Sequence, residues 1–378
     1  MEPVALNIGE PVVGVVATLF GILVLVLVMP LVSRRVEENL EPFFLLMGII
    51  AVTSIYLAGI LPGREVPKLA KNALLAPVTL HGVPIGITQV VFLAGLAFYY
   101  YHRPIYRGIG RLLTRLGVTW FIFVIVVLLG LTSSIISVIV AAVIYSEIMA
   151  ALPLPRGKKV EVTVLAAFAL GMGAALTPVG EPLATIVVHK LSGPPYHAGF
   201  DFLIRKLGDL VIPGVIGVAL YTALRAGKGV SNSLDLSVFE KLEYEETLAS
   251  ITMRAIRVYI FVAALELLGT GFTPLIEWYF SKIPSYIIYW VNMVSAIVDN
   301  ATLAAAEIGP FLHIDQIRSA LMGLLISGGM MIPGNIPNIV AAARLRIKSK
   351  EWMRVGVPFG LALLTIYFVA MAAMGMFH

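Results

Sequence analysis

The stretch GMGAALTPVGEP, residues 171–182, interrupts one apolar segment, and GGMMIPGNIPN, residues 328–338, interrupts a second segment in a similar way. Each places prolines and glycines in the middle of a run long enough to cross a bilayer. Because proline lacks a backbone donor and clashes with the preceding helical turn, we expect both helices to unwind there. Unwound backbone inside a membrane leaves carbonyl oxygens that need a partner. A bound cation supplies one, so the two stretches predict a binding site.

The composition around these stretches is typical of a helical membrane protein. Of the 378 residues, 59% are hydrophobic and 13% are charged, and the mean hydropathy is +0.94. Soluble domains carry about 25% charged residues, which excludes a soluble enzyme and a nucleic-acid-binding protein. Apolar runs of about 20 residues favour helices over a β-barrel. The net charge of +5 therefore reports membrane topology, and the absence of cysteine excludes disulfides and thiolate metal sites.

Hydropathy predicts an all-α polytopic membrane protein with full crossings and two hairpins. The hairpins, residues 118–153 and 285–311, are apolar but break at polar clusters. The first is expected to break at Thr132-Ser133-Ser134, with Ser137 following, and the second at residues 295–300. We expect both to be re-entrant, returning to the side from which they came. Full crossings are expected near residues 11–32, 41–61, 83–101, 160–189, 211–224, 253–271, 317–343 and 355–376.

Basic residues orient this topology, because most of the 27 Lys and Arg residues fall on one side once both hairpins are included. That side is expected to be the cytoplasm, which leaves both termini outside a plasma membrane. Residues 133–137 align with 295–299, and 177–181 align with 331–335. The chain therefore predicts inverted repeats, each with a re-entrant hairpin and a broken helix, as in secondary transporters. The expected units are scaffold helices 1–82, repeat one 83–225, a cytoplasmic linker 226–252 and repeat two 253–378.

Two carboxylates mark the expected sodium site. Asp299 lies at the tip of the second hairpin and Glu181 inside the first interrupted stretch, so both are expected near mid-membrane. Asp299 could also cap the returning limb, and this role is compatible with ion binding. Hard cations take oxygen ligands. The neutral oxygen ligands expected around the carboxylates are Ser133, Ser134, Ser137 and Thr177 in the first unit and Ser295, Asn300, Asn335 and Asn338 in the second.

The other ionisable residues of the apolar segments receive different predictions. Glu147 and Glu307 lie toward hairpin ends and are expected at the interface, while Glu266 is expected to make a structural hydrogen bond. The histidines lie near the ends of crossings and are expected to be interfacial side chains rather than ligands. They are His81, His102, His189, His197, His313 and His378.

The motif Ser295-x-x-x-Asp299-Asn300, together with Thr-Pro-Val-Gly-Glu-Pro at residues 177–182, resembles the ion transporter superfamily. The nearest resemblance is to its NhaD-type sodium/proton antiporters and to related uncharacterised predicted cation transporters, from about residue 83 onward. It implies a scaffold region, a transport region and usually a homodimer. The first hairpin departs from the family, since serines stand where related transporters often have Asn or Asp. Carried over by position, the resemblance implies ion-binding roles for Asp299, Asn300, Thr177, Gly180, Glu181, Gly334, Asn335 and Asn338.

The leading function expected is exchange of sodium or lithium for protons by alternating access. A desolvated carboxylate holds a proton near neutral pH, and sodium competes for the same oxygens. The alternatives are sodium-coupled uptake of a dicarboxylate-like anion and efflux of a metalloid oxyanion. Two like charges about 4 Å apart cost about 4 kcal/mol at an effective dielectric near 20, so an anion would require a protonated or sodium-bound carboxylate. The sequence shows no enzyme motif, and no cofactor or nucleic-acid partner is expected. The expected partners are membrane lipid and small cations.

Overall fold

The computed structural model describes residues 4–37, 39–79, 87–152, 154–227, 247–297 and 300–377, and this part of the chain is helical throughout, without strands. Four of its helices are long and apolar enough to cross a membrane, and shorter apolar helices accompany them, as the composition predicts. In chain order they are α1 Val13–Val32, α2 Arg34–Glu37, α3 Leu40–Leu57, α4 Val66–Leu75, α5 Ile87–Ile136, α6 Val138–Ala151, α7 Arg156–Ala174, α8 Pro182–Lys190, α9 Phe202–Ala226, α11 Leu248–Trp278, α12 Ser285–Val291, α13 Asn300–Glu307, α14 Ile314–Gly328, α15 Ile336–Leu345 and α16 Ser349–Ala373.

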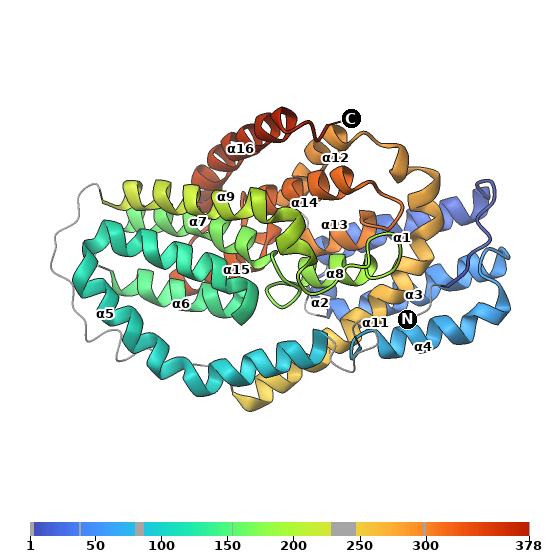
Figure 1. Cartoon of the computed structure of the whole chain (residues 1–378), viewed down its shortest axis with the longest axis horizontal. Coiled ribbons are helices and arrows are strands. Elements are labelled where there is room, and N and C mark those ends of the chain that lie inside the picture. The colour runs from blue at the N-terminus through green and yellow to red at the C-terminus, as the bar shows by residue number, and fades with distance from the viewer. Residues whose placement is uncertain are drawn as a thin grey trace.

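One end of the molecule is built from α1, α3, α4 and α11 (Figure 1). Small residues let these helices approach closely, since a Cβ at Gly271 of α11 would lie 2.5 Å from the Cβ of Ala51 on α3. Phe44 of α3 stacks on Phe261 of α11 with ring centroids 5.5 Å apart. The other end gathers α5, α6, α7, α9 and α16, while α8 and α13 lie between the two ends (Figure 1).

The α5–α6 segment differs from the predicted first hairpin. Residues 103–116, which precede the predicted hairpin, continue α5 until Gly117, whose φ of +68° favours glycine. The predicted break at Thr132-Ser133-Ser134 is wrong, because the helix continues to Ile136 and ends at Ser137 with φ +81°. The three hydroxyls bond back to carbonyls three or four residues earlier, so the polar triplet fits inside a helix.

Two further lengths differ from the hydropathy reading. The helix Gly117–Ile136 has 20 residues, enough for a full crossing and more than a limb that turns back at mid-membrane needs. The helices α9 and α11, with 25 and 31 residues, extend beyond the predicted crossings 211–224 and 253–271. Polar residues at their ends shortened the apolar windows without ending the helices.

Contacts between distant segments bring the predicted cytoplasmic regions together. Arg156, which begins α7, donates to the carbonyls of Leu345 and Arg346 at 2.6 and 2.7 Å. Lys158 donates to the Arg225 carbonyl at 3.1 Å, which joins the end of α9 to the start of α7. Toward the other end of α9, Asp209 pairs with Arg318, which lies near the start of α14. The grouping of loops therefore agrees with the expected topology, while the side facing the cytoplasm stays a prediction.

Candidate functional site

The first interrupted stretch separates α7 from α8. The helix α7 ends at Ala174 and α8 begins at Pro182. The Thr177 hydroxyl donates to the Ser134 carbonyl, and the Gly180 carbonyl accepts from the Val138 amide at 2.8 Å. The break between α7 and α8 is therefore held against the turn between α5 and α6.

The second interrupted stretch separates α14 from α15. The helix α14 ends at Gly328, a single 3-10 turn covers Ile332–Gly334, and α15 begins at Ile336. The side-chain amide of Asn338 donates through Nδ2 to the carbonyls of Gly328 and Met331 at 2.7 and 2.8 Å, and so closes the break. The Asn335 side chain caps α15 by accepting from the Ile336 amide at 2.8 Å.

Glycine is required at one position in each break. A Cβ at Gly180 would lie 2.0 Å from the Ala174 carbonyl oxygen and 2.8 Å from the Cα of Ser134. A Cβ at Gly334, the aligned position, would lie 2.5 Å from the Gly328 carbonyl oxygen and 2.6 Å from that of Ser295. At both places the backbone of the break therefore fits between the end of its own helix and the hairpin turn.

Serine hydroxyls make a second matched set of contacts. Ser133 shares its one O–H between the Gly130 carbonyl at 2.6 Å and the Leu170 carbonyl of α7 at 3.2 Å, and the aligned Ser295 donates to the Leu324 carbonyl of α14 at 3.3 Å. Leu170 and Leu324 occupy corresponding places, because each lies four residues before the last residue of its helix, Ala174 or Gly328. The same type of contact therefore joins α5 to α7 and the 3-10 segment Asn292–Ala296 to α14.

The two interrupted helices meet each other. A Cβ at Gly171 of α7 would lie 2.5 Å from the Asn335 amide nitrogen, so this cap of α15 lies directly against α7. Within the described residues, two side-chain atoms, Oδ1 of Asn338 and Nδ2 of Asn300, are buried and make no hydrogen bond. The predicted site residues that the structure buries are Ser133, Ser134, Thr177, Gly180, Glu181, Ser295, Asn300, Gly334, Asn335 and Asn338, while Ser137 is half-buried.

Asp299, the main predicted ligand, lies outside the described residues, as does the neighbouring Val298. The hairpin that carries Asp299 is described on both sides, by a 3-10 segment Asn292–Ala296 and by α13 from Asn300. The role of Asp299 as a sodium ligand therefore stays a prediction.

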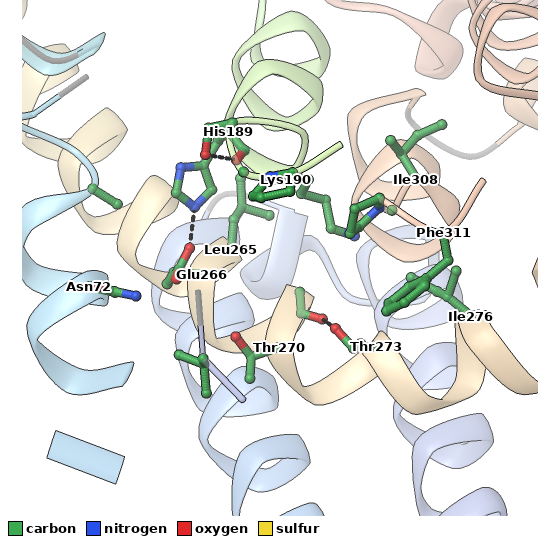
Figure 2. Close-up of a pocket in the computed structure, with 18 of the residues that line it drawn as sticks. Asn72, His189, Lys190, Leu265, Glu266, Thr270, Thr273, Ile276, Ile308 and Phe311 are labelled. Atoms are coloured by element: carbon green, nitrogen blue, oxygen red, sulfur yellow. Dashed lines mark hydrogen bonds and ion pairs between the residues drawn. The ribbon is translucent and has the colours of Figure 1, made fainter. Parts of the chain in front are cut away.

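A cavity of about 420 Å³ lies away from the two breaks, between α4, α8, α11 and the loop after α13 (Figure 2). Its polar lining includes Asn72, His189, Lys190, Glu266 and Thr270. Sequence reasoning missed this cavity, because it depends on which helices pack together rather than on any short motif.

His189 corrects one expectation of the sequence. It was expected to be interfacial, yet its side chain is 5% exposed, and its Nε2 lies 2.6 Å from Oε2 of Glu266 (Figure 2). The physical reason is that α8 packs against α11, which turns the end of α8 inward. Glu266 makes a structural hydrogen bond, as expected, and its partner is His189.

The two carboxylates near hairpin ends have basic neighbours from the opposite half. Glu147 of α6 pairs with Arg344 of α15 at 3.1 Å. Lys190, at the end of α8, donates to the Ala305 carbonyl of α13 and interacts electrostatically with Glu307. Glu307, expected at the interface, also accepts a hydrogen bond from the Asn292 amide at 2.7 Å.

Comparison with known proteins gives a family and no activity. A family model described as a protein of unknown function, DUF1646, matches residues 16–374, which is almost the whole chain. No curated protein matches the chain.

Proposed function

The chain belongs to the DUF1646 family, and we propose that it is a secondary active cation transporter, a sodium/proton antiporter of the plasma membrane that works by alternating access. The observation that carries the proposal is the pair of interrupted helices, each closed against a hairpin turn by aligned residues: Gly180 and Gly334 in the breaks, Ser133 and Ser295 on the hairpins. Matched elements of this kind support an inverted repeat, and transporters built from such repeats bind their ions where the repeats meet.

Contacts across the halves support the same proposal. The helix α8 packs against α13 of the other half, and α15 packs against α6. Lys190 and Arg344 are aligned residues, one near the end of α8 and the other near the end of α15. Each reaches the returning limb of the opposite hairpin. In the expected topology these two equivalent contacts lie on opposite sides of the membrane. If they break one at a time, the site opens to one side and then to the other, as alternating access requires.

The proposed cation site lies between the breaks and the second hairpin. Glu181, buried at the start of α8, and Asp299 would supply the charge. Asn300 and Asn338 would supply neutral contacts through one side-chain atom each, Nδ2 of Asn300 and Oδ1 of Asn338, which are buried and make no hydrogen bond within the described residues: Asn338 Oδ1 can face a cation, and Asn300 Nδ2 can orient a carboxylate. Proton and sodium would compete for the same carboxylates, so no enzymatic step or cofactor is needed.

The experiment that tests the function uses purified protein in vesicles loaded with a pH-sensitive dye. Sodium, lithium, potassium and a dicarboxylate are added in turn as salts of impermeant counterions. Proton movement driven by sodium or lithium, without any dicarboxylate, is the expected result. A response only when sodium and dicarboxylate are present together would contradict the antiporter. It would favour the alternative function, sodium-coupled uptake of a dicarboxylate-like anion.

A further inference from the structure

The pair formed by His189 and Glu266 occupies an unusual place. It joins the last turn of α8, which follows the first interrupted stretch, to the middle of α11, which belongs to neither a predicted hairpin nor an interrupted helix. The 2.6 Å contact puts an imidazole nitrogen and a carboxylate oxygen at hydrogen-bonding distance, with the histidine side chain only 5% exposed. Histidine is the side chain whose ordinary pKa lies nearest to neutral pH. Even a half-buried carboxylate in an apolar helix, such as that of Glu266, is costly unless a hydrogen bond or a proton compensates its charge.

We propose that His189 and Glu266 form a second proton-binding site, separate from the predicted carboxylate site at the breaks. Along α8, His189 lies eight residues after Glu181, a length of about 12 Å at 1.5 Å per residue. A proton taken up from water would reside on the His189 ring, and the Glu266 carboxylate would accept the ring N–H. Loss of the proton returns it to water and leaves a neutral imidazole bonded to the carboxylate.

The cavity beside the pair gives the proton a route. Its volume of about 420 Å³ is enough for several water molecules, each of which takes about 30 Å³ in the liquid. Figure 2 shows His189 and Glu266 on its wall, with the Thr270 and Thr273 hydroxyls on the same face of α11. Water in a cavity of this size, beside the polar groups of its wall, can exchange protons with the ring.

The other charged group in the described lining of the cavity, Lys190, has partners of its own. Lys190 is the nearest cation in the lining, and it is directed to α13, where it meets the Ala305 carbonyl and the Glu307 charge. From α4 the described lining contributes Asn72, and from the segment after α4 it contributes Thr79; neither carries a charge. Within the described lining, Glu266 and His189 are therefore the groups that can exchange a proton with the cavity without breaking the Lys190 contacts.

This site would couple the proton to movement. The neutral imidazole already makes a charge-assisted hydrogen bond to the ionised carboxylate, and protonation adds the attraction between opposite charges. Protonation of His189 would therefore hold α8 to α11, and its loss would ease their separation. The transport role rests on the proposed function, whereas proton binding itself does not.

The test is nitrogen NMR of the purified full-length chain with selectively labelled histidine rings, recorded from pH 5 to pH 9. The chain has 6 histidines, so the His189 signal is assigned by its absence in His189→Gln. If that variant fails to fold, a chain with the other histidines replaced by Gln gives the same assignment. The expected result is a change of the His189 ring from charged to neutral within this range. A ring that keeps one form from pH 5 to pH 9 would overturn the proposal.

A second variant tests the partnership. Glu266→Gln keeps a hydrogen-bonding side chain but removes the charge, and should move the midpoint of the His189 transition by about one pH unit toward lower pH. His313→Gln, at an exposed position before α14 that does not line the cavity, is the matched control and should leave the midpoint unchanged. An unchanged midpoint in Glu266→Gln would contradict the pair as one site. Because NMR needs no transport, these results stand even if the vesicles exchange no cation.

Discussion

A methyl group at Gly180 would lie 2.0 Å from the Ala174 carbonyl oxygen, and one at Gly334 would lie 2.5 Å from that of Gly328. Both obstacles are backbone atoms, which cannot turn away. We therefore expect Gly180→Ala and Gly334→Ala each to lower the free energy of unfolding by about 1–3 kcal/mol. Thermal unfolding in detergent measures this. Gly217→Ala on α9, where a Cβ would meet nothing within 4 Å, is the control, and equal stability of all three variants would refute the steric argument.

Glu181 gives a prediction about ion binding at the same scale. Glu181→Gln keeps the size of this buried side chain and removes one negative charge. We expect the sodium concentration for half-maximal exchange to rise about tenfold, equivalent to about 1.4 kcal/mol. The exposed Asp201 offers the control variant Asp201→Asn, which should not change it. If Glu181→Gln exchanges sodium with unaltered half-saturation, Glu181 is only the residue that precedes α8.

Pairs of elements supply the next prediction, because Ser133 and Ser295 make equivalent bonds between a hairpin and an interrupted helix. Ser133→Ala and Ser295→Ala should each cost about 0.5–1.5 kcal/mol of unfolding free energy, the net value of one hydrogen bond. Chemical or thermal unfolding of both variants gives the comparison. Thr53→Ala is the control, since that exposed hydroxyl bonds only within its own helix, to Ile49. A cost confined to one of the two serines would argue against their equivalence.

The sequence predicted the helix breaks well and the hairpin turn poorly. Proline alone does not mark a break, since Pro213, Pro274 and Pro358 lie inside α9, α11 and α16. Pro178 and Pro333 were informative because each stands beside glycine and a second proline. Serine and threonine can end a helix or bond back into it, so the triplet at 132–134 was ambiguous. The structure places the turn at Ser137 instead.

The site was predictable only in part. Residues inside the interrupted stretches, such as Thr177, could be singled out by position, and the structure places them against the hairpins. The pairing of His189 with Glu266 could not, because the two residues are far apart in the chain and meet only through the packing of α8 on α11. Neighbours from distant segments leave no mark in the sequence of either segment.

At the scale of the whole molecule, the orientation in the membrane is open to a direct test. The chain contains no cysteine, so a single thiol can be placed without background labelling. A cysteine at Ser349, beside the cluster of Arg156 with Leu345 and Arg346, should react with an impermeant reagent only from the cytoplasm. A cysteine at His313, which precedes α14 at the opposite end, should react only from outside. The reverse labelling would invert the topology and the direction of both hairpins.

The central claim, that sodium and protons compete for the same carboxylates, is tested most directly by counting protons released when sodium binds. Purified protein in weakly buffered detergent near neutral pH receives sodium chloride, with choline chloride as the control for ionic strength. The wild type should release protons as sodium saturates, and Asp299→Asn should release few or none. Sodium binding by the wild type without proton release, with binding established by a thermal shift in the same solution, would contradict the antiport mechanism.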